Sequence, residues 1–419
     1  MKHQILSTIT LILAAPVFLL VQARATGGTF QGLGTLPGGA WSAAYGLSPD
    51  GTVIVGGTGG VCSREAFRWT AAEGMAGLGQ LAAGEESYAW SASPGGSFIV
   101  GYSELPWAEP LPLAAPHPSQ AFRWSPSGGM QGLGYLPGNI ASTSRAYAVS
   151  AGGTVVAGEG YETSGVLAMR WTETSGMQAL GLLTGAAESS ARGVSADGSV
   201  VVGWAYTYSG DPLKGETFRQ AFRWTQEGAM IGLGYLPGRD ASSAYAVSAD
   251  GSMVVGVSYR FLNTLSLEVD NFQEAFVWTE ADGMVGLGDL PGGRAYSAAY
   301  GVSGDGRVIV GQAESAAGLE AFVWTPSQGM RSLWDILLAE GVTAMEGWTL
   351  TTASAVSQDG RTIVGSGMSP EGNTEAWVAT IPEPSSLSLL ALNALGLLTV
   401  RRFKTRAGLR VQGKHKESN

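Results

Sequence analysis

The stretch "FQGLGTLPGG" (Phe30–Gly39) returns three more times in nearly the same form. It reads "GLGYLPG" at Gly132–Gly138 and at Gly232–Gly238, and "GLGDLPGG" at Gly286–Gly293. An "AFRWT"-like run precedes each later copy, but no such run precedes Phe30. The first copy is therefore the end of a repeat. The later copies show the complete repeat.

Three landmarks each recur seven times along the chain. One is a tryptophan, at Trp69, Trp124, Trp171, Trp224, Trp278, Trp324 and Trp377. Another is a serine that ends a run of small residues, at Ser48, Ser93, Ser150, Ser195, Ser248, Ser303 and Ser357. The third is a leucine, at Leu33, Leu78, Leu133, Leu180, Leu233, Leu287 and Leu333. Three independent landmarks with the same count predict seven units.

Each unit is expected to contain four short strands. In one unit "SSAYAVS" (Ser242–Ser248) has small side chains and "SMVVGVS" (Ser252–Ser258) is apolar and β-branched, and the Asp-Gly pair between them is a hairpin turn signal. "EAFVWT" (Glu274–Thr279) and "MVGLG" (Met284–Gly288) complete the unit. Four antiparallel strands repeated at this interval are typical of a β-propeller blade, with small residues at the axis and Phe and Trp between blades.

The order of the strands predicts how the ring closes. The repeats begin with a fourth strand (Thr29–Gly34) and end with a third one (Glu375–Thr380). Pairing the two would complete a seventh blade and leave no open edge, which disfavours an open solenoid. We therefore predict an all-β, seven-bladed β-propeller over residues 26–380, closed by its N-terminal strand.

Both ends of the chain resemble targeting segments. Residues 1–25 have a basic start, an apolar stretch and a small-residue site at Ala23 and Ala25, the pattern of a signal peptide removed by signal peptidase. Residues 385–400 are apolar enough for a short transmembrane helix, and Arg401 and Arg402 follow. The last segment, 407–419, is a basic tail.

Charge and composition restrict the partners. The whole chain carries a formal charge of −10, but residues 26–400 hold 15 Lys and Arg against 33 Asp and Glu, a net charge of −18. This acidic surface argues against nucleic acid as a partner. Cys62 is the single cysteine, and His117 is the single histidine outside the two ends. We therefore expect no cofactor, no metal site of His and Cys, and no Ser-His-Asp triad.

Two repeated polar features have plain structural interpretations. Asp-Gly pairs begin at Asp50, Asp197, Asp250, Asp305 and Asp359; they are expected to form turns rather than calcium sites, because glycine pairs fill the same place in two units. Arginines precede the tryptophan at Arg68, Arg123, Arg170 and Arg223. They could bind an anionic glycan, but local pairing with carboxylates is the preferred interpretation.

Candidate ligand-binding residues are expected in the long loops between the second and third strands. Aromatic and acidic side chains gather there, a combination suited to stacking on a sugar and hydrogen bonding to it; the alternative is that the aromatic residues cover the cores of the loops. The candidates are Trp107, Glu109, Trp204, Tyr206, Tyr208, Asp211, Tyr259 and Asp270.

The repeat "AFRWTxxxGMxGLGxLPGG…SxAxxVSxDGxxVVG" resembles the HAF repeats of bacterial extracellular proteins over nearly all of residues 30–380. Residues 381–406 are similar to a PEP-CTERM sorting signal, with Pro382, Glu383 and Pro384 before the apolar helix and the arginines. The resemblance implies recognition by an exosortase-type membrane protease. It also implies at least transient anchoring in the inner membrane through the C-terminal helix, and release or transfer to the outer surface.

We expect an exported surface protein, not an enzyme, with a binding or structural role in an extracellular polysaccharide or biofilm matrix. One alternative is a polysaccharide hydrolase or lyase, which requires two carboxylates facing each other about 5–9.5 Å apart. The other is a protein–protein adhesin, which requires a contiguous apolar patch on the loop face.

Overall fold

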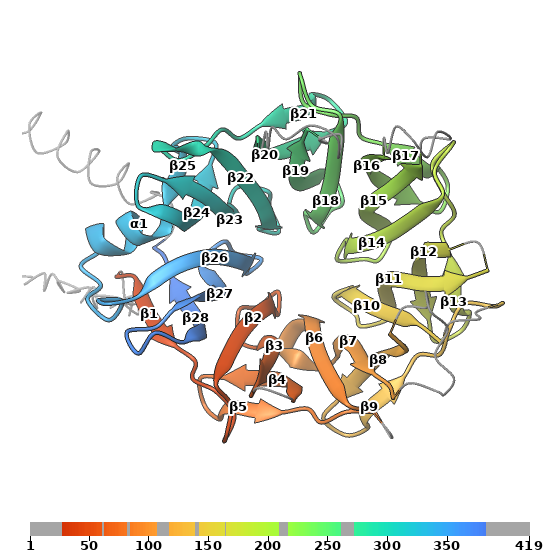
Figure 1. Ribbon diagram of the computed structural model, residues 1–419, viewed down its shortest axis with the longest axis horizontal. Helices are drawn as coiled ribbons and strands as arrows, with labels where there is room; N and C mark the ends of the chain where they lie inside the picture. The colour runs from red at the N-terminus through yellow and green to blue at the C-terminus, as the bar shows by residue number, and fades with distance from the viewer. Residues whose placement is uncertain are drawn as a thin grey trace, which may run out of the picture.

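The computed structural model of the chain describes residues 27–60, 63–81, 84–106, 117–138, 142–163, 165–208, 217–260 and 272–382 (Figure 1). Nearly all regular structure in these residues is β-strand. The exceptions are the short helix α1 (Leu333–Ala339) and a single 3-10 turn (Pro94–Gly96). The predictions for the signal peptide, including Ala23 and Ala25, fall outside these residues.

The described strands form antiparallel sets of four. Three sheets are β2 (Trp41–Leu47), β3 (Ile54–Gly59), β4 (Arg64–Thr70) and β5 (Gly74–Gly77); β6 (Glu86–Ala92), β7 (Ile99–Glu104), β8 (Ser119–Ser125) and β9 (Gly129–Gly132); and β10 (Ser144–Val149), β11 (Val155–Glu162), β12 (Gly165–Thr172) and β13 (Gly176–Ala179). A fourth is β14 (Glu188–Val194), β15 (Val200–Tyr208), β16 (Thr217–Thr225) and β17 (Ala229–Gly232).

The next eight strands are joined in one sheet made of two such sets. They are β18 (Ala241–Val247), β19 (Met253–Tyr259), β20 (Gln273–Thr279) and β21 (Gly283–Gly286), then β22 (Gly292–Val302), β23 (Ile309–Ser315), β24 (Gly318–Thr325) and β25 (Gly329–Ser332). One parallel contact, Gln273 with Tyr296, links the sets.

The last sheet combines strands from both ends of the described chain. Its order is β1 (Thr29–Gly32), β28 (Thr374–Thr380), β27 (Thr362–Met368) and β26 (Thr349–Val356). The antiparallel register places Thr29 opposite Thr380 and Gly32 opposite Trp377.

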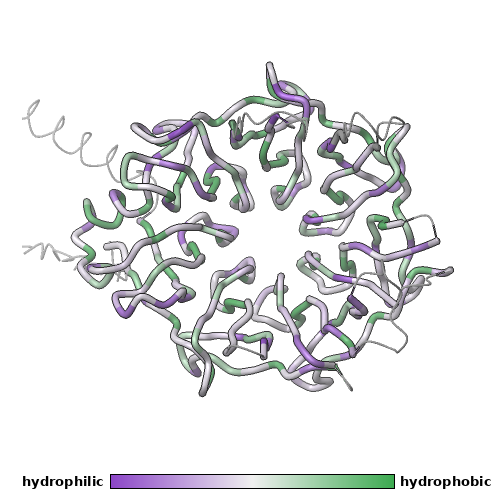
Figure 2. The backbone as a smooth tube through the Cα atoms, viewed as in Figure 1, coloured by the Kyte–Doolittle hydropathy of each residue, from purple (hydrophilic) through white to green (hydrophobic). Residues whose placement is uncertain are grey.

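The sheets are arranged around a central axis, with the first strand of each set innermost (Figure 1). The prediction of an all-β protein built from four-stranded antiparallel sheets in a propeller arrangement is confirmed. Figure 2 shows hydrophobic segments in every sheet rather than in one place. Each sheet therefore packs against its neighbours, and the core is distributed around the ring.

Phenylalanines on the third strands carry much of this core. Phe67 packs with Ala44 and Leu33 and with residues of the neighbouring β27 and β28. Equivalent phenylalanines are fully buried at Phe122, Phe222, Phe276 and Phe322. Trp377 occupies this phenylalanine position, because it pairs with Gly365 as Phe67 pairs with Gly56. The seventh tryptophan of the repeat is therefore two positions away from the place that the spacing assigned to it.

Buried serines on the innermost strands join neighbouring sheets. Ser87 Oγ accepts a hydrogen bond from the Ala66 N–H (2.9 Å) and donates one to the Gly79 carbonyl (2.7 Å). Such a pair of bonds connects the inner strand of one sheet to the third strand of the preceding sheet. The same pair is made by Ser42, Ser144, Ser189, Ser242 and Ser297.

Two described residues, Ile381 and Pro382, follow the last strand, β28. The N–H of Ile381 donates to the Arg361 carbonyl, and Pro382 is the last described residue. Within the described part of the chain no helix is long and apolar enough to cross a bilayer. The predicted helix at 385–400 and its flanking residues Glu383, Pro384, Arg401 and Arg402 lie outside that part.

Candidate axial binding site

Each innermost strand breaks its register at the same place. In β10 the pairing with β11 shifts between Ala146 and Ala148, so Tyr147 has no partner across the ladder. Such a bulge bends the strand and turns one side chain out of the normal alternation. The residues at this position around the ring are Tyr45, Trp90, Tyr147, Arg192, Tyr245, Tyr300 and Ser354.

A glycine on the second strand accommodates each bulge. A Cβ on Gly158 would collide with the carbonyl oxygen of Arg145, two residues before the bulged Tyr147. The carbonyl that precedes the bulge can approach this closely only where the neighbouring strand lacks a side chain. The equivalent glycines are Gly56, Gly101, Gly203, Gly256, Gly311 and Gly365.

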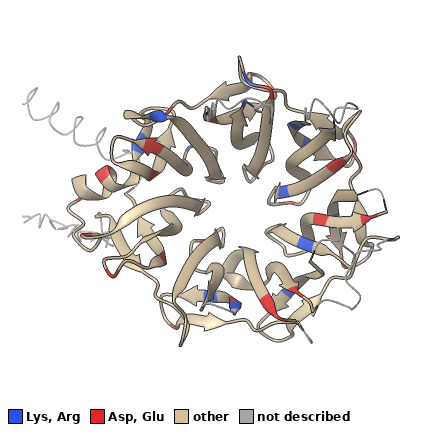
Figure 3. Cartoon of the chain, viewed as in Figure 1, with Lys and Arg blue, Asp and Glu red and all other residues tan. Residues whose placement is uncertain are grey.

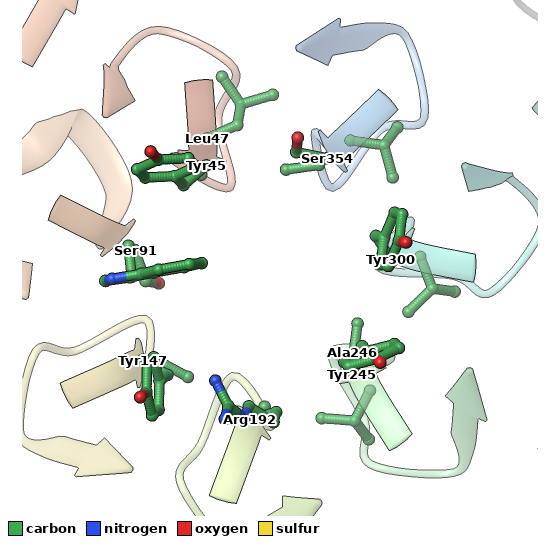
Figure 4. A pocket seen from close by; sticks show the side chains of 18 of the residues that line it. Tyr45, Leu47, Ser91, Tyr147, Arg192, Tyr245, Ala246, Tyr300 and Ser354 are labelled. Carbon is green, nitrogen blue, oxygen red and sulfur yellow. The ribbon is translucent and has the colours of Figure 1, made fainter. Parts of the chain in front are cut away.

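The bulged residues surround a pocket of about 590 Å³ on the axis (Figure 4). This volume is within the range of small-ligand sites. Next to the aromatic layer lies an apolar layer, formed by Leu47, Val149, Val194, Val247, Val302 and Val356. Of the described residues that line the pocket, none is Asp or Glu, and Arg192 is the one with a charge.

The aromatic side chains contact one another across sheet boundaries. Tyr45 stacks on Trp90 with ring centroids 4.6 Å apart, and Trp90 meets Tyr147 edge to face at 5.5 Å. Tyr245 and Tyr300 form a tilted pair at 5.4 Å. Each ring is partly exposed toward the axis. Rings that are already fixed by neighbours offer a ligand flat faces at little cost in side-chain entropy.

A buried carboxylate supports the charged side of the pocket. Glu159 on β11 accepts hydrogen bonds from the hydroxyls of Tyr147 (2.8 Å) and Ser190 (2.7 Å). Arg145 and Arg192 approach the same carboxylate at 3.5 and 3.7 Å. The Arg192 guanidinium also lies 4.0 Å from the centre of the Tyr147 ring. One carboxylate thus faces two guanidinium groups, which leaves a positive charge at this side of the axis.

The tyrosines around the pocket remain protonated. Burial, together with the nearby Glu159 charge, raises the pKa of Tyr147, and burial raises the pKa of Tyr102 to about 12. Burial likewise raises the pKa of Tyr45, Tyr245 and Tyr300. At neutral pH these hydroxyls can therefore donate hydrogen bonds to a ligand or to a protein acceptor.

The loop assignment was wrong for Trp204 and Tyr206, which lie on strand β15, and for Tyr259, which lies on β19. Trp204 and Tyr206 lie beside this site. Trp204 on β15 is 5.9 Å from the Arg192 guanidinium carbon and 4.2 Å from that of Arg219. Tyr206 is 5.9 Å from Arg219. Tyr259 ends β19 opposite Ala241. The other candidates, Trp107, Glu109, Asp211 and Asp270, and the side chain of Tyr208, fall outside the described structure.

Two of the arginines before the tryptophans, Arg68 and Arg123, make contacts within and between sheets. Arg68 forms an ion pair with Glu73, in agreement with the preferred interpretation. Arg123 lies between the rings of Phe98 (4.7 Å) and Trp171 (4.9 Å), so it connects two neighbouring sheets. They do not line the axial pocket.

The carboxylates of the Asp-Gly pairs serve the turns. In Asp197 the Oδ1 atom accepts hydrogen bonds from the Ser195 hydroxyl (2.6 Å) and from the N–H of Ser199 (3.0 Å). Gly198 follows with φ of 79°, a conformation that favours glycine. The same serine–aspartate bond is present at Asp50, Asp250, Asp305 and Asp359.

Inspection of the sequence missed the axial residues, although a signal was present. Each of them stands three positions before the repeat serine, as Tyr45 stands before Ser48. At that position five of the seven units carry Tyr or Trp among otherwise small residues. A large aromatic residue in a strand of small residues, close to a crowded axis, could have indicated the axial site.

Comparison with known proteins supports the fold class. No family model and no curated protein matches the sequence. Among solved structures, an oligogalacturonate lyase from Vibrio parahaemolyticus is 12% identical with a TM-score of 0.51, covering 84% of this chain and 94% of that one. A virginiamycin B lyase from Staphylococcus aureus is 12% identical with a TM-score of 0.44, covering 84% and 99%. The likeness to the oligogalacturonate lyase supports the fold class, a β-propeller, and nothing finer.

Proposed function

We propose that this chain is an exported, closed seven-bladed β-propeller that binds a saccharide in its axial pocket. The observation that carries this proposal is the ring of aromatic side chains, with Arg192 and Ser354, around a pocket of about 590 Å³. Pyranose rings have apolar faces that stack on aromatic side chains, while their edges carry hydroxyl groups. The hydroxyls of Tyr45, Tyr245 and Tyr300 are suited to hydrogen bonding with those edges.

Closure of the ring is supported by the sheet that contains both β1 and β28. The Gly34 N–H donates to Glu375 Oε1 (2.8 Å), as the Gly79 N–H donates to Glu65 Oε1 (3.0 Å) in the β2–β5 sheet. β1 therefore has the hydrogen-bonding environment of an outer strand. The seven sets of strands in this proposal are those of the seven repeat units.

The proposal also includes the sorting route. Signal peptidase would cleave after Ala25, and an exosortase would act at Pro382, Glu383 and Pro384. The short distance from the end of β28 at Thr380 to Pro382 supports this role, because the sorting segment would begin where the sheet ends. The protein would then function at the outer surface or in a polysaccharide matrix, with binding rather than catalysis as its activity.

Affinity electrophoresis through gels that contain neutral or acidic polysaccharides tests the binding function. We expect retardation of the purified protein by at least one polymer. In the Trp90→Ala variant that retardation should weaken about tenfold or more, because one stacking face is lost. The matched control is Tyr235→Ala, an exposed aromatic outside the pocket (36% exposed). If no polymer retards the folded protein, or if both variants lose binding equally, the axial site is wrong.

A further inference from the structure

The charge of the axial pocket is confined to one side. Arg192 projects into the opening beside Tyr147 (Figure 4). The opposite side is polar and uncharged, with Thr352, Ser354 and Ser366. Figure 3 shows basic residues on the axial parts of β10 and β14. The net charge between residues 26 and 400 is −18. This side of the pocket is therefore positively charged although the protein as a whole is acidic.

The protein satisfies the hydrogen-bonding capacity of the Arg192 guanidinium only in part. Among the described residues Arg192 forms an ion pair with Glu159 alone, at 3.7 Å, and the shorter hydrogen bonds of Glu159 go to Tyr147 and Ser190. The Nε atom of Arg192 is buried and has no hydrogen-bond partner among the described residues. A guanidinium has five N–H donors in a planar fork that matches a carboxylate. The Arg192 side chain as a whole is 25% exposed and lines the pocket, so its terminal N–H groups can reach an anionic group there.

A second arginine extends this side of the site away from the axis. The centre of the Trp204 ring is 5.9 Å from the guanidinium carbon of Arg192 and 4.2 Å from that of Arg219. Arg219 Nε is also buried without a hydrogen-bond partner among the described residues. Because Trp204 pairs with Ser190 and Tyr206 with Glu188, β15 runs from the bulge toward the start of β14. Arg192, Trp204 and Arg219 therefore follow one another from the edge of the pocket along β15.

We infer that the saccharide bound by this site is a uronate polymer, with one carboxylate at Arg192 and a further carboxylate at Arg219. The inference rests on the proposed saccharide-binding function. The rings of Trp90 and Tyr147 hold the sugar in the pocket, and the adjacent Arg192 selects the acidic form. Trp204 supports the next part of the chain on its way out along β15.

The test compares each acidic polymer with its own neutral form. Alginate and polygalacturonate are assayed beside their carboxyl-reduced counterparts, which keep the sugar backbone and lose the charge, at an ionic strength near 0.15 M to screen the long-range field. We expect the full-length protein to bind the acidic forms about tenfold or more tightly. Equal affinity for both forms overturns the inference and leaves the proposed function standing. Absence of binding to all four polymers overturns the proposed function as well.

Variants then assign the selectivity to residues. Arg192→Gln should weaken binding of the acidic polymer about tenfold more than binding of the reduced polymer. Circular dichroism and thermal unfolding show independently whether the variant is folded. Arg192→Lys should be intermediate, because lysine keeps the charge without the planar fork. The matched control is Arg294→Gln, which removes an exposed arginine that pairs with Glu314 outside the pocket. If Arg294→Gln reduces the preference equally, general charge explains it and the assignment is wrong.

Arg219→Gln tests the direction in which a longer ligand leaves the pocket. We expect weaker binding of uronate oligomers but unchanged binding of a monouronate, because only a longer ligand reaches from Arg192 to Arg219. If the variant binds oligomers as the wild type does, the path along β15 is not used. If it loses the monouronate as well, Arg219 acts on the pocket itself rather than on the next sugar.

Discussion

At the scale of single residues, the Ser-x-Asp-Gly turn shows how one short segment satisfies many polar groups. The serine hydroxyl donates to the aspartate and accepts from the backbone five residues later, as Ser195 does from the Val200 N–H (2.9 Å). Hydrogen bonds from the Ser195 hydroxyl and from Ser199 lower the pKa of Asp197. The ionised carboxylate is therefore favoured in the folded protein.

This pKa shift predicts an acid-sensitive contribution to stability. Because the folded pKa lies below the ordinary value of 3.8, the stabilisation is fully present above that value and is lost as the pH falls through the folded pKa. Asp197→Asn should unfold at a lower temperature than the wild type at pH 7, and the two should converge as the pH drops below about 4. Thermal unfolding at several pH values measures this. A gap independent of pH would contradict it, and Glu227→Gln in the exposed β16–β17 turn is the control.

The residue scale is also where the sequence was most informative. Aspartate before glycine identifies the turn because both residue types are required by the backbone, and alternating apolar residues identify the strands. The axial residues were not predicted because they lie at bulges, where the alternation is interrupted. The carboxylate network of Glu159 was not predictable either, because it joins residues from β10, β11 and β14 whose approach depends on the packing of two sheets.

At the scale of the element, each bulge in an innermost strand depends on a glycine in the second strand. The bulge aims a side chain at the axis, and the glycine on the second strand leaves room for the displaced carbonyl. In β15 a Cβ on Gly203 would collide with the Ser190 carbonyl, two residues before Arg192. The repeated "VVG" of the sequence is therefore linked to the binding site, although the glycine does not contact the pocket.

Gly203→Ala should accordingly destabilise the protein by about 1–3 kcal/mol, because backbone atoms must shift to admit the methyl group. It should also weaken polysaccharide binding by moving Arg192. The control is Gly152→Ala, where the new Cβ would make only an ordinary contact of 3.7 Å with Thr154. Urea unfolding and affinity electrophoresis measure the two effects. Equal stability of the two variants would show that the bulge relaxes without the glycine.

At the scale of the whole molecule, backbone hydrogen bonds run from sheet to sheet beside the turns. The N–H of Ala196 donates to the Ala249 carbonyl (3.0 Å), and Gln358 donates to Pro49 (2.7 Å) across the proposed closure. Similar bonds join Ala151 to Ala196, Ala249 to Gly304 and Gly304 to Gln358. Pro49 and Pro94 occupy the same position and have no N–H to donate. Near Pro94, the Gly95 N–H bonds to the Asp50 carboxylate instead.

The stability of the ring should depend strongly on β1. Phe30 is buried (7% exposed) and meets Trp348 edge to face at 5.2 Å. Phe30→Ala should cost about 3–5 kcal/mol and expose the edge of β28 to other chains. Val285→Ala on the outer strand β21, where the side chain is 46% exposed, is the control. Denaturant unfolding and size-exclusion chromatography measure the loss and any self-association. A variant as stable as the control would show that β1 is dispensable.

The pairing of β1 with β28 affects the order in which the protein can fold during synthesis. Thr29 and Thr380 share a hydrogen bond (2.7 Å) although 351 positions separate them in the chain. The ribosome synthesises β1 before the other described strands. β1 cannot pair with β28 until that strand, the last one described, has been translated. Contacts between such distant segments form slowly. If the ring closes as proposed, a chain that stops before β28 leaves the edge of β1 unpaired, and chaperones can recognise such an edge. Pairing of β1 with β28 would then mark the proposed ring as fully synthesised.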